Sequence, residues 1–235
     1  MNSIIDLIRT RLTESADEKT RESSQRFFKE KIDLYGVKVP EVNKIAKEYL
    51  KEVKPLGKEK VFDLAEILWQ SGMPEESFVA CNWIYAFRKG FKPNDFDRFK
   101  HWIDSYVNNW ASCDTFCNHT LGEFVEMYPE FISELKAFTY SENRWMRRAA
   151  AVTFIIPARK GLFLETVFDI ADHLLSDSDD LVQKGYGWML KAASQAHLQE
   201  VFDYVMKNKA NMPRTALRYS IEKMPKEMKE QAMKK

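Results

Sequence analysis

The stretch NNWASCD, residues 108–114, sets an indole and a carboxylate four residues apart in the middle of a chain of 235 residues. Residues four apart share one face of a helix, so Trp110 and Asp114 are predicted to lie side by side. Arg148 follows Asp114 after 34 residues, about one repeat of a solenoid built from helix pairs. The stretch therefore predicts a repeat protein whose functional side chains recur on equivalent helices.

The second helix expected in each later pair carries a similar triplet. The triplets are Cys113-Asp114-Thr115, Arg147-Arg148-Ala149, Gln183-Lys184-Gly185 and Pro213-Arg214-Thr215, at steps of 34, 36 and 30 residues. Stacked helix pairs bury their apolar faces only on their neighbours, so equivalent positions point the same way. The predicted row of side chains is Asp114, Arg148, Lys184 and Arg214, with Trp110 and Trp188 one turn from its first and third members.

The composition favours long helices joined by short connections. Only eight glycines and eight prolines are present, while 30% of residues are charged and 45% are hydrophobic. Such a chain is typical of an all-α, well-folded protein. No apolar run approaches the roughly 20 residues of a membrane span, and the start lacks the apolar part of a signal peptide. We therefore expect a cytoplasmic protein with no membrane contact.

Apolar periodicity predicts the order of the helices. The first helical region is expected over residues 2–35 with a break at 15–17, followed by an extended stretch at 37–40 and a helix from 42 to 53. Helix pairs are expected from residue 59 onward, with turns at 72–74 and 92–95. Their later members are expected at 110–124, 129–138, 144–156, 163–175, 181–194, 198–207 and 213–224, and Pro157 is expected to end the helix before it.

Charge alternates along the second half of the sequence. Residues 144–160 contain bases and no acid, residues 165–180 contain acids and no Lys or Arg, and residues 204–221 again contain only bases. In a stack of helical hairpins such segments are expected on opposite walls, one basic and one acidic. A basic wall indicates nucleic acid as the partner, while solvated faces that alternate by chance are the alternative.

The cysteines Cys81, Cys113 and Cys117 are odd in number and form no C-x-x-C pair, which is typical of a reducing compartment. Cys113 and Cys117 could share a helical face and bind a metal together with His119. No second Cys/His pair completes a tetrahedral set. We therefore expect buried, small apolar side chains, and no metal or cofactor.

Other candidate residues have a structural alternative. The tryptophans that fall within apolar periodicity and are predicted to lie in the core are Trp69, Trp83, Trp102 and Trp145. Trp110 and Trp188 could equally be core or surface residues. The glycines around Trp188 would let another chain approach closely. Asp114 could be only a helix N-cap, and Arg147 and Arg148 could be ordinary solvated charges.

The sequence contains none of the usual catalytic signatures. It has no P-loop, G-x-G-x-x-G, H-E-x-x-H or G-x-S-x-G motif, and its four histidines are scattered. Most hydrolases and nucleotide-dependent enzymes are thereby excluded.

Three segments resemble the AlkD family of alkylpurine DNA glycosylases. They are NWASCD (109–114), RWMRRAA (144–150) and GYGW (185–188), and the similarity extends from FFK (27–29) and GVKVPE (36–41) to PRTAL (213–217). The resemblance implies an α-solenoid of HEAT-like, armadillo-type antiparallel helix pairs. It implies one domain over residues 1–235 that holds DNA in a concave basic groove.

The resemblance also implies roles for individual residues. Trp110 and Trp188 match the family's aromatic pair, Asp114 its catalytic carboxylate and Arg148 its DNA-contacting arginine. The remaining residues expected to contact DNA are Lys184, Arg214, Arg218, Phe27 and Lys38. Phe27 replaces a family Tyr, Lys38 a Gln, and Asn109 the first of two adjacent tryptophans, and the lost hydroxyl and amide bear on lesion preference.

The expected function is base excision repair of alkylation damage. A purine alkylated at N3 or N7 carries positive charge and leaves as a neutral base, so a carboxylate near the oxocarbenium-like sugar is the group that hydrolysis needs. Indoles beside the lesion add cation-π attraction. We therefore expect a monomeric DNA glycosylase that acts on 3-methyladenine and 7-methylguanine in double-stranded DNA. The alternative is a non-catalytic HEAT-repeat protein that binds DNA or a protein partner.

Overall fold

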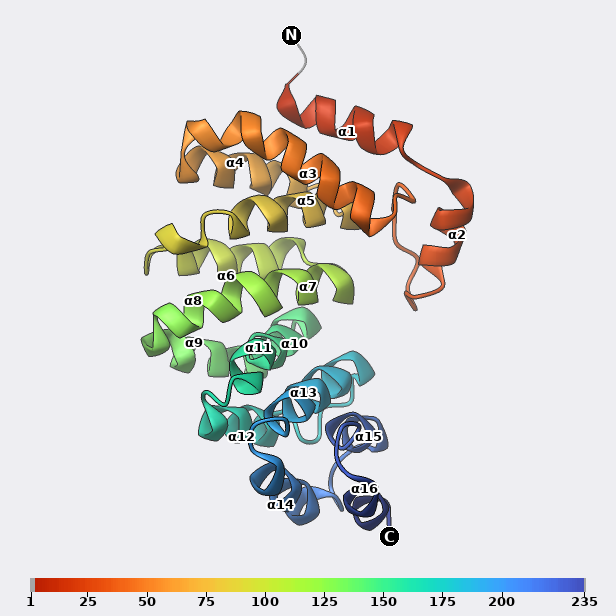
Figure 1. Cartoon of the computed structure of the whole chain (residues 1–235), viewed down its shortest axis with the longest axis vertical. Coiled ribbons are helices and arrows are strands. Elements are labelled where there is room, and N and C mark those ends of the chain that lie inside the picture. The colour runs from red at the N-terminus through yellow and green to blue at the C-terminus, as the bar shows by residue number, and fades with distance from the viewer. Residues whose placement is uncertain (1–2, 235) are drawn as a thin grey trace. The chain divides into compact units, whose positions relative to one another are not determined.

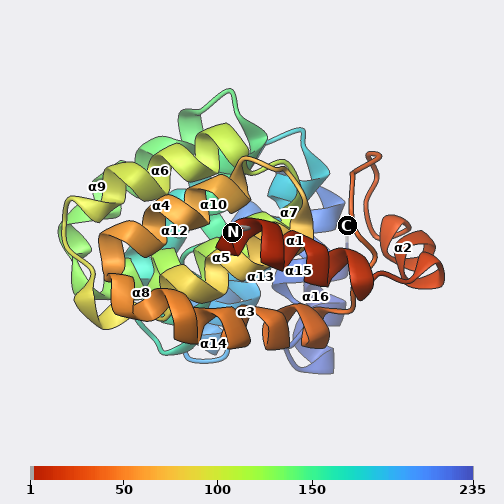
Figure 2. The same cartoon turned by 90° about the horizontal axis from the view of Figure 1, so that it is seen from above.

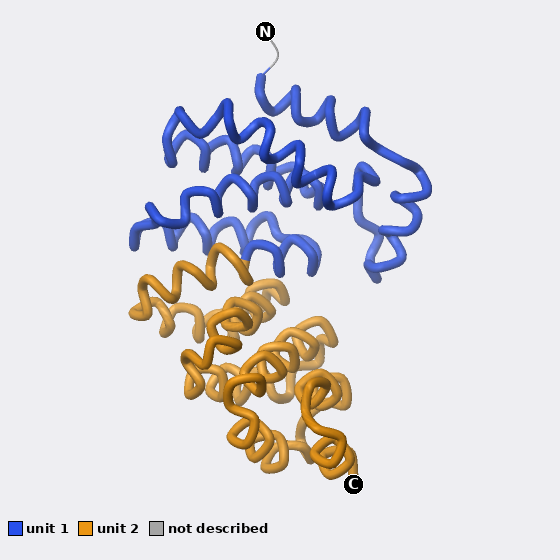
Figure 3. The backbone as a smooth tube through the Cα atoms, viewed as in Figure 1, with its two compact units in different colours: residues 1–116 blue, residues 117–235 orange. Residues whose placement is uncertain are grey.

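The computed structural model describes residues 3–234, and these residues form helices and connecting turns without a strand (Figure 1). The all-α prediction is confirmed, and the helix pairs are those of an α-solenoid. The chain divides into two compact units, Met1–Phe116 and Cys117–Lys235 (Figure 3). The expectation of a single domain over residues 1–235 stays a prediction. No helix within the described range is both long and apolar enough to cross a bilayer.

The first unit is a stack of helices with one arm beside it. Its helices are α1 Ile4–Glu14, α2 Glu18–Gln25, α3 Val39–Val53, α4 Lys58–Trp69, α5 Pro74–Tyr85, α6 Asp95–Tyr106 and α7 Trp110–Phe116. Helix α5 packs against both α3 and α4 and also contacts α7. Helix α2 and the segment after it lie to one side of this stack (Figure 2). The predicted pairing of α4 with α5 is confirmed.

The predicted first helical region is wrong beyond Gln25. Helix α2 ends there, and residues 28–38 form no helix before α3 begins at Val39. Gly36 has a φ of +87°, and a Cβ at this position would lie 2.7 Å from the Cβ of Arg21. Gly36 cannot belong to a helix in this conformation, and residues 28–35 before it are not helical either, so their aromatic periodicity has another cause.

An aromatic cluster forms the core of the first unit. Phe99 has its ring centroid 5.8 Å from that of Trp102 and 5.6 Å from that of Phe116, and Trp69 meets Phe116 edge to face. The indole of Trp83 donates to the carbonyl of Ala46 over 2.9 Å. The core predictions for Trp69, Trp83, Trp102 and Trp145 are confirmed, and all three cysteines are buried as expected of small apolar side chains.

The second unit begins with a π-helical turn, Cys117–Leu121, and continues in helix pairs. Its helices are α8 Gly122–Met127, α9 Ile132–Ala137, α10 Arg144–Val152, α11 Ile155–Arg159, α12 Leu164–His173, α13 Asp180–Ala193, α14 Leu198–Asn208, α15 Arg214–Ser220 and α16 Lys226–Met233. Short 3-10 turns flank α9. Helix α16 is not predicted by the periodicity. Helix α13 packs against α10, α12 and α15, so it is the central element of this unit.

The expectation that Pro157 ends a helix is wrong. The break comes earlier, at Thr153 and Phe154, and Pro157 is the third residue of α11. Backbone N–H groups in the first turn of a helix have no partner within the helix, so a proline is tolerated there. The Thr153 hydroxyl donates to the carbonyl of Ala149 at the end of α10, over 2.8 Å. Such side-chain bonds compete with helix continuation.

Candidate nucleic-acid interface

The start of α7 is capped by Asn109. Its side-chain oxygen accepts a hydrogen bond from the backbone N–H of Ser112 over 2.9 Å, and its carbonyl accepts from the N–H of Cys113. This is the geometry of an N-cap residue. The interpretation of Asp114 as the N-cap is therefore wrong, since Asp114 is the fifth residue of α7.

The capped end of α7 is tied to α5. The hydroxyls of Ser77 and Ser112 lie 2.6 Å apart, both buried, and the amide of Asn109 donates to the Ser112 hydroxyl over 2.9 Å. The amide of Asn108 donates to the carbonyl of Gly72 just before α5. Each of these side chains has a hydrogen-bond partner, and together the bonds fix the position of the helix start.

Trp110 is the first residue of α7 and is half-buried. Its indole N–H donates to the carbonyl of Phe27 over 3.2 Å, and its ring lies 5.6 Å from the ring of Phe28 at an angle of 30°. The aromatic periodicity of residues 27–35 thus supplies a support for this indole rather than a helix. Trp110 is not a core residue, because it is only partly buried.

Asp114 lies one helical turn after Trp110 in the same helix. Asp114 is 8% exposed, so the residue is largely removed from water. Charge interactions are stronger at such a position than at the surface. The predicted pairing of an indole and a carboxylate on one helix face agrees with this arrangement.

Two buried glutamates at the start of α5 hold the segment that precedes α3. Glu75 accepts from the backbone N–H of Gly36 over 2.8 Å and of Val37 over 3.2 Å. Glu76 accepts from the Tyr35 hydroxyl over 2.7 Å and forms a salt bridge with Arg9 at 3.0 Å. Burial, together with the bond to Glu76, raises the pKa of the Tyr35 hydroxyl, which therefore stays protonated and donates.

Phe27 and Lys38 flank this held segment. Phe27 is 73% exposed, which is unusual for a phenylalanine, and its carbonyl accepts a hydrogen bond from Trp110. Lys38 is exposed and precedes α3 in an extended conformation. Both residues are exposed, so a ligand bound to the first unit can contact them.

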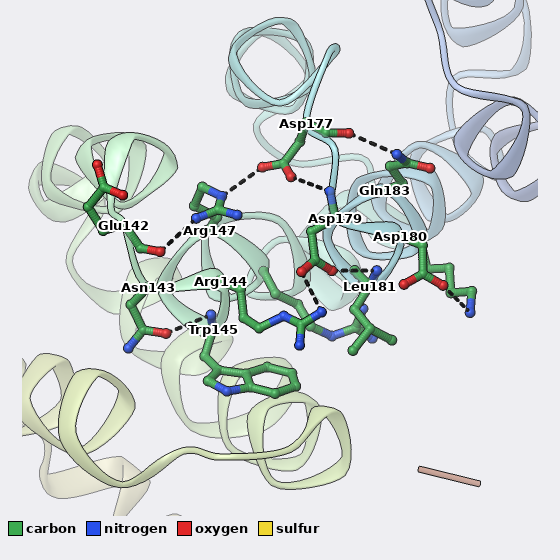
Figure 4. Close-up of polar contacts among 12 residues, drawn as sticks. Glu142, Asn143, Arg144, Trp145, Arg147, Asp177, Asp179, Asp180, Leu181 and Gln183 are labelled. Atoms are coloured by element: carbon green, nitrogen blue, oxygen red, sulfur yellow. Dashed lines mark hydrogen bonds and ion pairs between the residues drawn. The ribbon is translucent and has the colours of Figure 1, made fainter. Parts of the chain in front are cut away.

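In the second unit, the loop before α13 is bound to the start of α10 (Figure 4). Arg147 forms a salt bridge with Asp177 at 2.7 Å, and Arg144 pairs with Asp179. Asp179 also accepts from the backbone N–H of Leu181 and so caps α13. The expectation that the basic and acidic segments lie on opposite walls is wrong here, because these arginines neutralise the acidic loop.

Arg148 is buried in the second unit, at 5% exposure. Its guanidinium donates to the carbonyl of Leu181 in the first turn of α13. A Cβ at Gly185 would lie 3.4 Å from the Arg148 side chain, which is an ordinary contact distance, so the arginine packs closely against α13. The interpretation of Arg147 and Arg148 as ordinary solvated charges is therefore wrong.

Lys184 and Trp188 lie one turn apart on α13. Lys184 forms a salt bridge with Asp180 at 3.1 Å, and Trp188 is half-buried rather than a core residue. A Cβ at Gly187 would lie 2.7 Å from the Cβ of Tyr219 in α15. Gly187 therefore accommodates the neighbouring helix α15 of the same chain, rather than the second chain that the glycines beside Trp188 suggested.

Arg214 and Arg218 are the accessible cations of α15. Both are exposed, and their spacing of four residues places them on one helix face. Neither has a carboxylate partner within the described residues. They contrast with Arg144 and Arg147, whose charges are compensated within the unit.

The predicted site residues are thus divided between the units. The first unit holds Phe27, Lys38, Trp110 and Asp114. Within it, the indole of Trp110 donates to the carbonyl of Phe27. The second unit holds Arg148, Lys184, Trp188, Arg214 and Arg218. Residues that sequence reasoning missed are Phe28, which supports Trp110, and Asn109, which caps α7. An Asn directly before an indole at a helix start is the signal that could have identified the cap.

Comparison with known proteins agrees with this fold. The chain aligns over 90% of its length and over 98% of the other chain with a solved structure described as a predicted DNA alkylation repair enzyme from Enterococcus faecalis, with a TM-score of 0.80 and 21% sequence identity. At this identity the likeness establishes the fold, an all-α repeat protein. A search of curated proteins gave no match. The sequence profile of the DNA alkylation repair enzyme family matches residues 8–224, and the chain belongs to that family.

Proposed function

We propose that the protein is a DNA glycosylase that hydrolyses the N-glycosidic bond of purines made cationic by alkylation at N3 or N7. The observation that carries this proposal is the arrangement of α7, where a largely buried Asp114 follows a partly accessible Trp110 by one turn. Asn109 caps the helix, so the carboxylate is not needed for capping. Family membership in DNA alkylation repair supports a substrate with alkylated bases.

The reaction needs little help from a general acid, because the leaving base does not have to be protonated. The positively charged base departs as a neutral molecule when the bond between its nitrogen and the sugar C1′ breaks, and both bonding electrons go to the base. Positive charge then develops on the sugar. In the proposed role, Asp114 stabilises this charge and orients the water that attacks C1′, as carboxylates do in glycoside hydrolysis.

The indoles are proposed to recognise the charge on the damaged base. A cation over an indole face is attracted by about 0.5–2 kcal/mol, and a neutral base lacks this attraction. Trp110 is suited to this role because Phe27 and Phe28 hold its ring and the residue is only partly buried. Trp188, half-buried on α13, is the proposed second indole.

Phosphate contacts are proposed for Lys184, Arg214 and Arg218. Arg148, which is buried and donates to the carbonyl of Leu181, is proposed to support the start of α13 beside them. Arg214 and Arg218 suit phosphate contact most directly, since both are exposed and neither has a carboxylate partner in the described chain. Cations that neutralise phosphates release counterions and make binding depend on salt. Phe27 and Lys38 are proposed to contact the same DNA from the first unit.

The experiment that tests the proposal is incubation of the protein with duplex DNA that contains 7-methylguanine, followed by measurement of the free base. Release well above the spontaneous rate is the expected result. Release at the spontaneous rate, together with retained DNA binding, would instead identify a non-catalytic DNA-binding member of the family.

A further inference from the structure

A basic hollow lies in the first unit, away from α7. It has a volume of about 600 Å³ and is bounded by the end of α3, the start of α4 and the turn after α5. Its charged lining residues are Lys54, Lys58, Glu59, Arg88, Lys89 and Lys92. Five cations thus surround the space, with one carboxylate among them.

A buried ion pair fixes the backbone of this hollow. Lys58 contacts the Asp95 carboxylate at 2.7 Å and also donates to the carbonyl of Gly90. Asp95 is 5% exposed and accepts from the backbone N–H of Lys92 over 2.7 Å. These contacts bind the loop between α5 and α6 to the start of α4. The positions from which Lys89 and Lys92 extend are therefore fixed.

The remaining cations have no compensating charge among the described residues. Asp95 is occupied by Lys58, and Glu59 pairs with Lys58 as well, at 3.5 Å. Across residues 3–234, Lys54, Lys89 and Lys92 form no salt bridge. Arg88 lies over the ring of Tyr85, with its guanidinium carbon 4.5 Å from the ring centroid.

Like charges gathered without a counter-charge repel one another, and an anion between them removes that repulsion. We propose that this hollow binds phosphate groups that are linked in series, because several separated cations match several separated negative charges. Two sources carry such groups: the phosphodiester backbone of DNA and a free polyphosphate. The binding chemistry is the same for both.

The hollow is separate from the proposed reaction site. Ser77 in the first turn of α5 contacts Ser112 beside Trp110, whereas the hollow lies beyond the opposite end of α5. A helix of 12 residues is roughly 18 Å long. The inference therefore does not depend on base excision, and its test uses undamaged DNA.

The test compares two double variants that remove the same charge. Lys89→Gln/Lys92→Gln alters the hollow, and Lys47→Gln/Lys100→Gln alters two exposed lysines elsewhere in the same unit. For each protein, binding to an undamaged duplex is measured against salt concentration. The rise in melting temperature with inorganic tripolyphosphate is measured in parallel. All four substituted lysines are exposed, so both variants are expected to fold.

If DNA is the source, the hollow variant shows a slope of log K against log salt that is shallower by about two units, and the control keeps the wild-type slope. If a free polyphosphate is the source, the slope is unchanged but the tripolyphosphate-induced rise in melting temperature falls by at least half in the hollow variant alone. The inference is overturned if neither quantity changes, or if the control variant changes equally. Absence of base release would not affect either readout.

Discussion

The indole nitrogen of Trp110 donates to the carbonyl of Phe27, 83 residues earlier in the chain. This bond joins α7 to a segment that forms no helix and that Glu75 and Glu76 hold against α5. The ring of Phe28 completes the support. The orientation of the proposed lesion-sensing indole is thus determined by the N-terminal arm of the protein as well as by its own helix.

Phe28→Ala is expected to lower excision of 7-methylguanine by about 2–10-fold, the equivalent of removing one aromatic pair of about 0.5–1.5 kcal/mol. Phe28→Tyr keeps the ring and should retain activity. Phe168→Ala is the matched control, because it removes a stacked ring at 4.7 Å from Tyr204 outside the proposed site. Single-turnover release is the measurement, and equal reductions in both Ala variants would show that Phe28 acts only through general stability.

Trp110→Ala and Trp188→Ala are each expected to slow excision of a cationic base. The activation free energy should rise by about 0.5–2 kcal/mol, because cation-π attraction requires the charge of the lesion. Binding to undamaged DNA should change less than excision. The measurement is single-turnover release beside affinity for an undamaged duplex. Parallel reductions in the two quantities would contradict a charge-sensing role.

Gly187→Ala is expected to destabilise the fold by about 1–3 kcal/mol, since the added Cβ would overlap Tyr219 and lie 2.9 Å from the carbonyl oxygen of Ala216. Gly185→Ala, two residues earlier on α13, meets its nearest atom at 3.4 Å and should be nearly neutral. Chemical denaturation of both variants measures the difference. Equal stabilities would show that α13 and α15 do not pack this closely in solution.

Arg214→Gln/Arg218→Gln is expected to make the salt dependence of DNA binding shallower by about two units, one for each phosphate that is no longer neutralised. Thermal stability should remain near the wild-type value, because both side chains are exposed. Arg148→Ala should differ by lowering stability, since Arg148 is buried and donates to Leu181. An unchanged slope in the double variant would place the DNA away from α15.

Most helices could be predicted from the sequence because their apolar positions recur with helical spacing. The four core tryptophans follow the same rule. The non-helical conformation of the arm at residues 26–38 could not be predicted, because the aromatic residues of the arm also recur at helical spacing. Its actual conformation depends on Gly36 and on Glu75, which lies 39 residues later in the chain. A local pattern does not reveal such a distant hydrogen bond.

Among the candidate site residues, too, those set by local spacing could be predicted and those set by distant contacts could not. Trp110 and Asp114 could be paired from their spacing, since one helix carries both. The roles of Arg144 and Arg147 could not be predicted, because counting charges along the chain does not reveal that these arginines compensate the loop before α13. The hydrogen bond between Asn109 and the backbone N–H of Ser112 establishes Asn109 as the cap, a position that an Asn just before a helix start indicates in the sequence.

Base release by Asp114→Asn is the most direct test of the proposed chemistry. The change keeps the size of the side chain and removes its negative charge, and α7 keeps its cap at Asn109. Single-turnover release of 7-methylguanine is expected to fall by roughly 10²–10³-fold, the scale for one preorganised electrostatic group. DNA binding should hold or tighten, because a carboxylate near phosphates opposes association. Release at the wild-type rate by a folded, DNA-binding Asp114→Asn protein would contradict the catalytic role of Asp114.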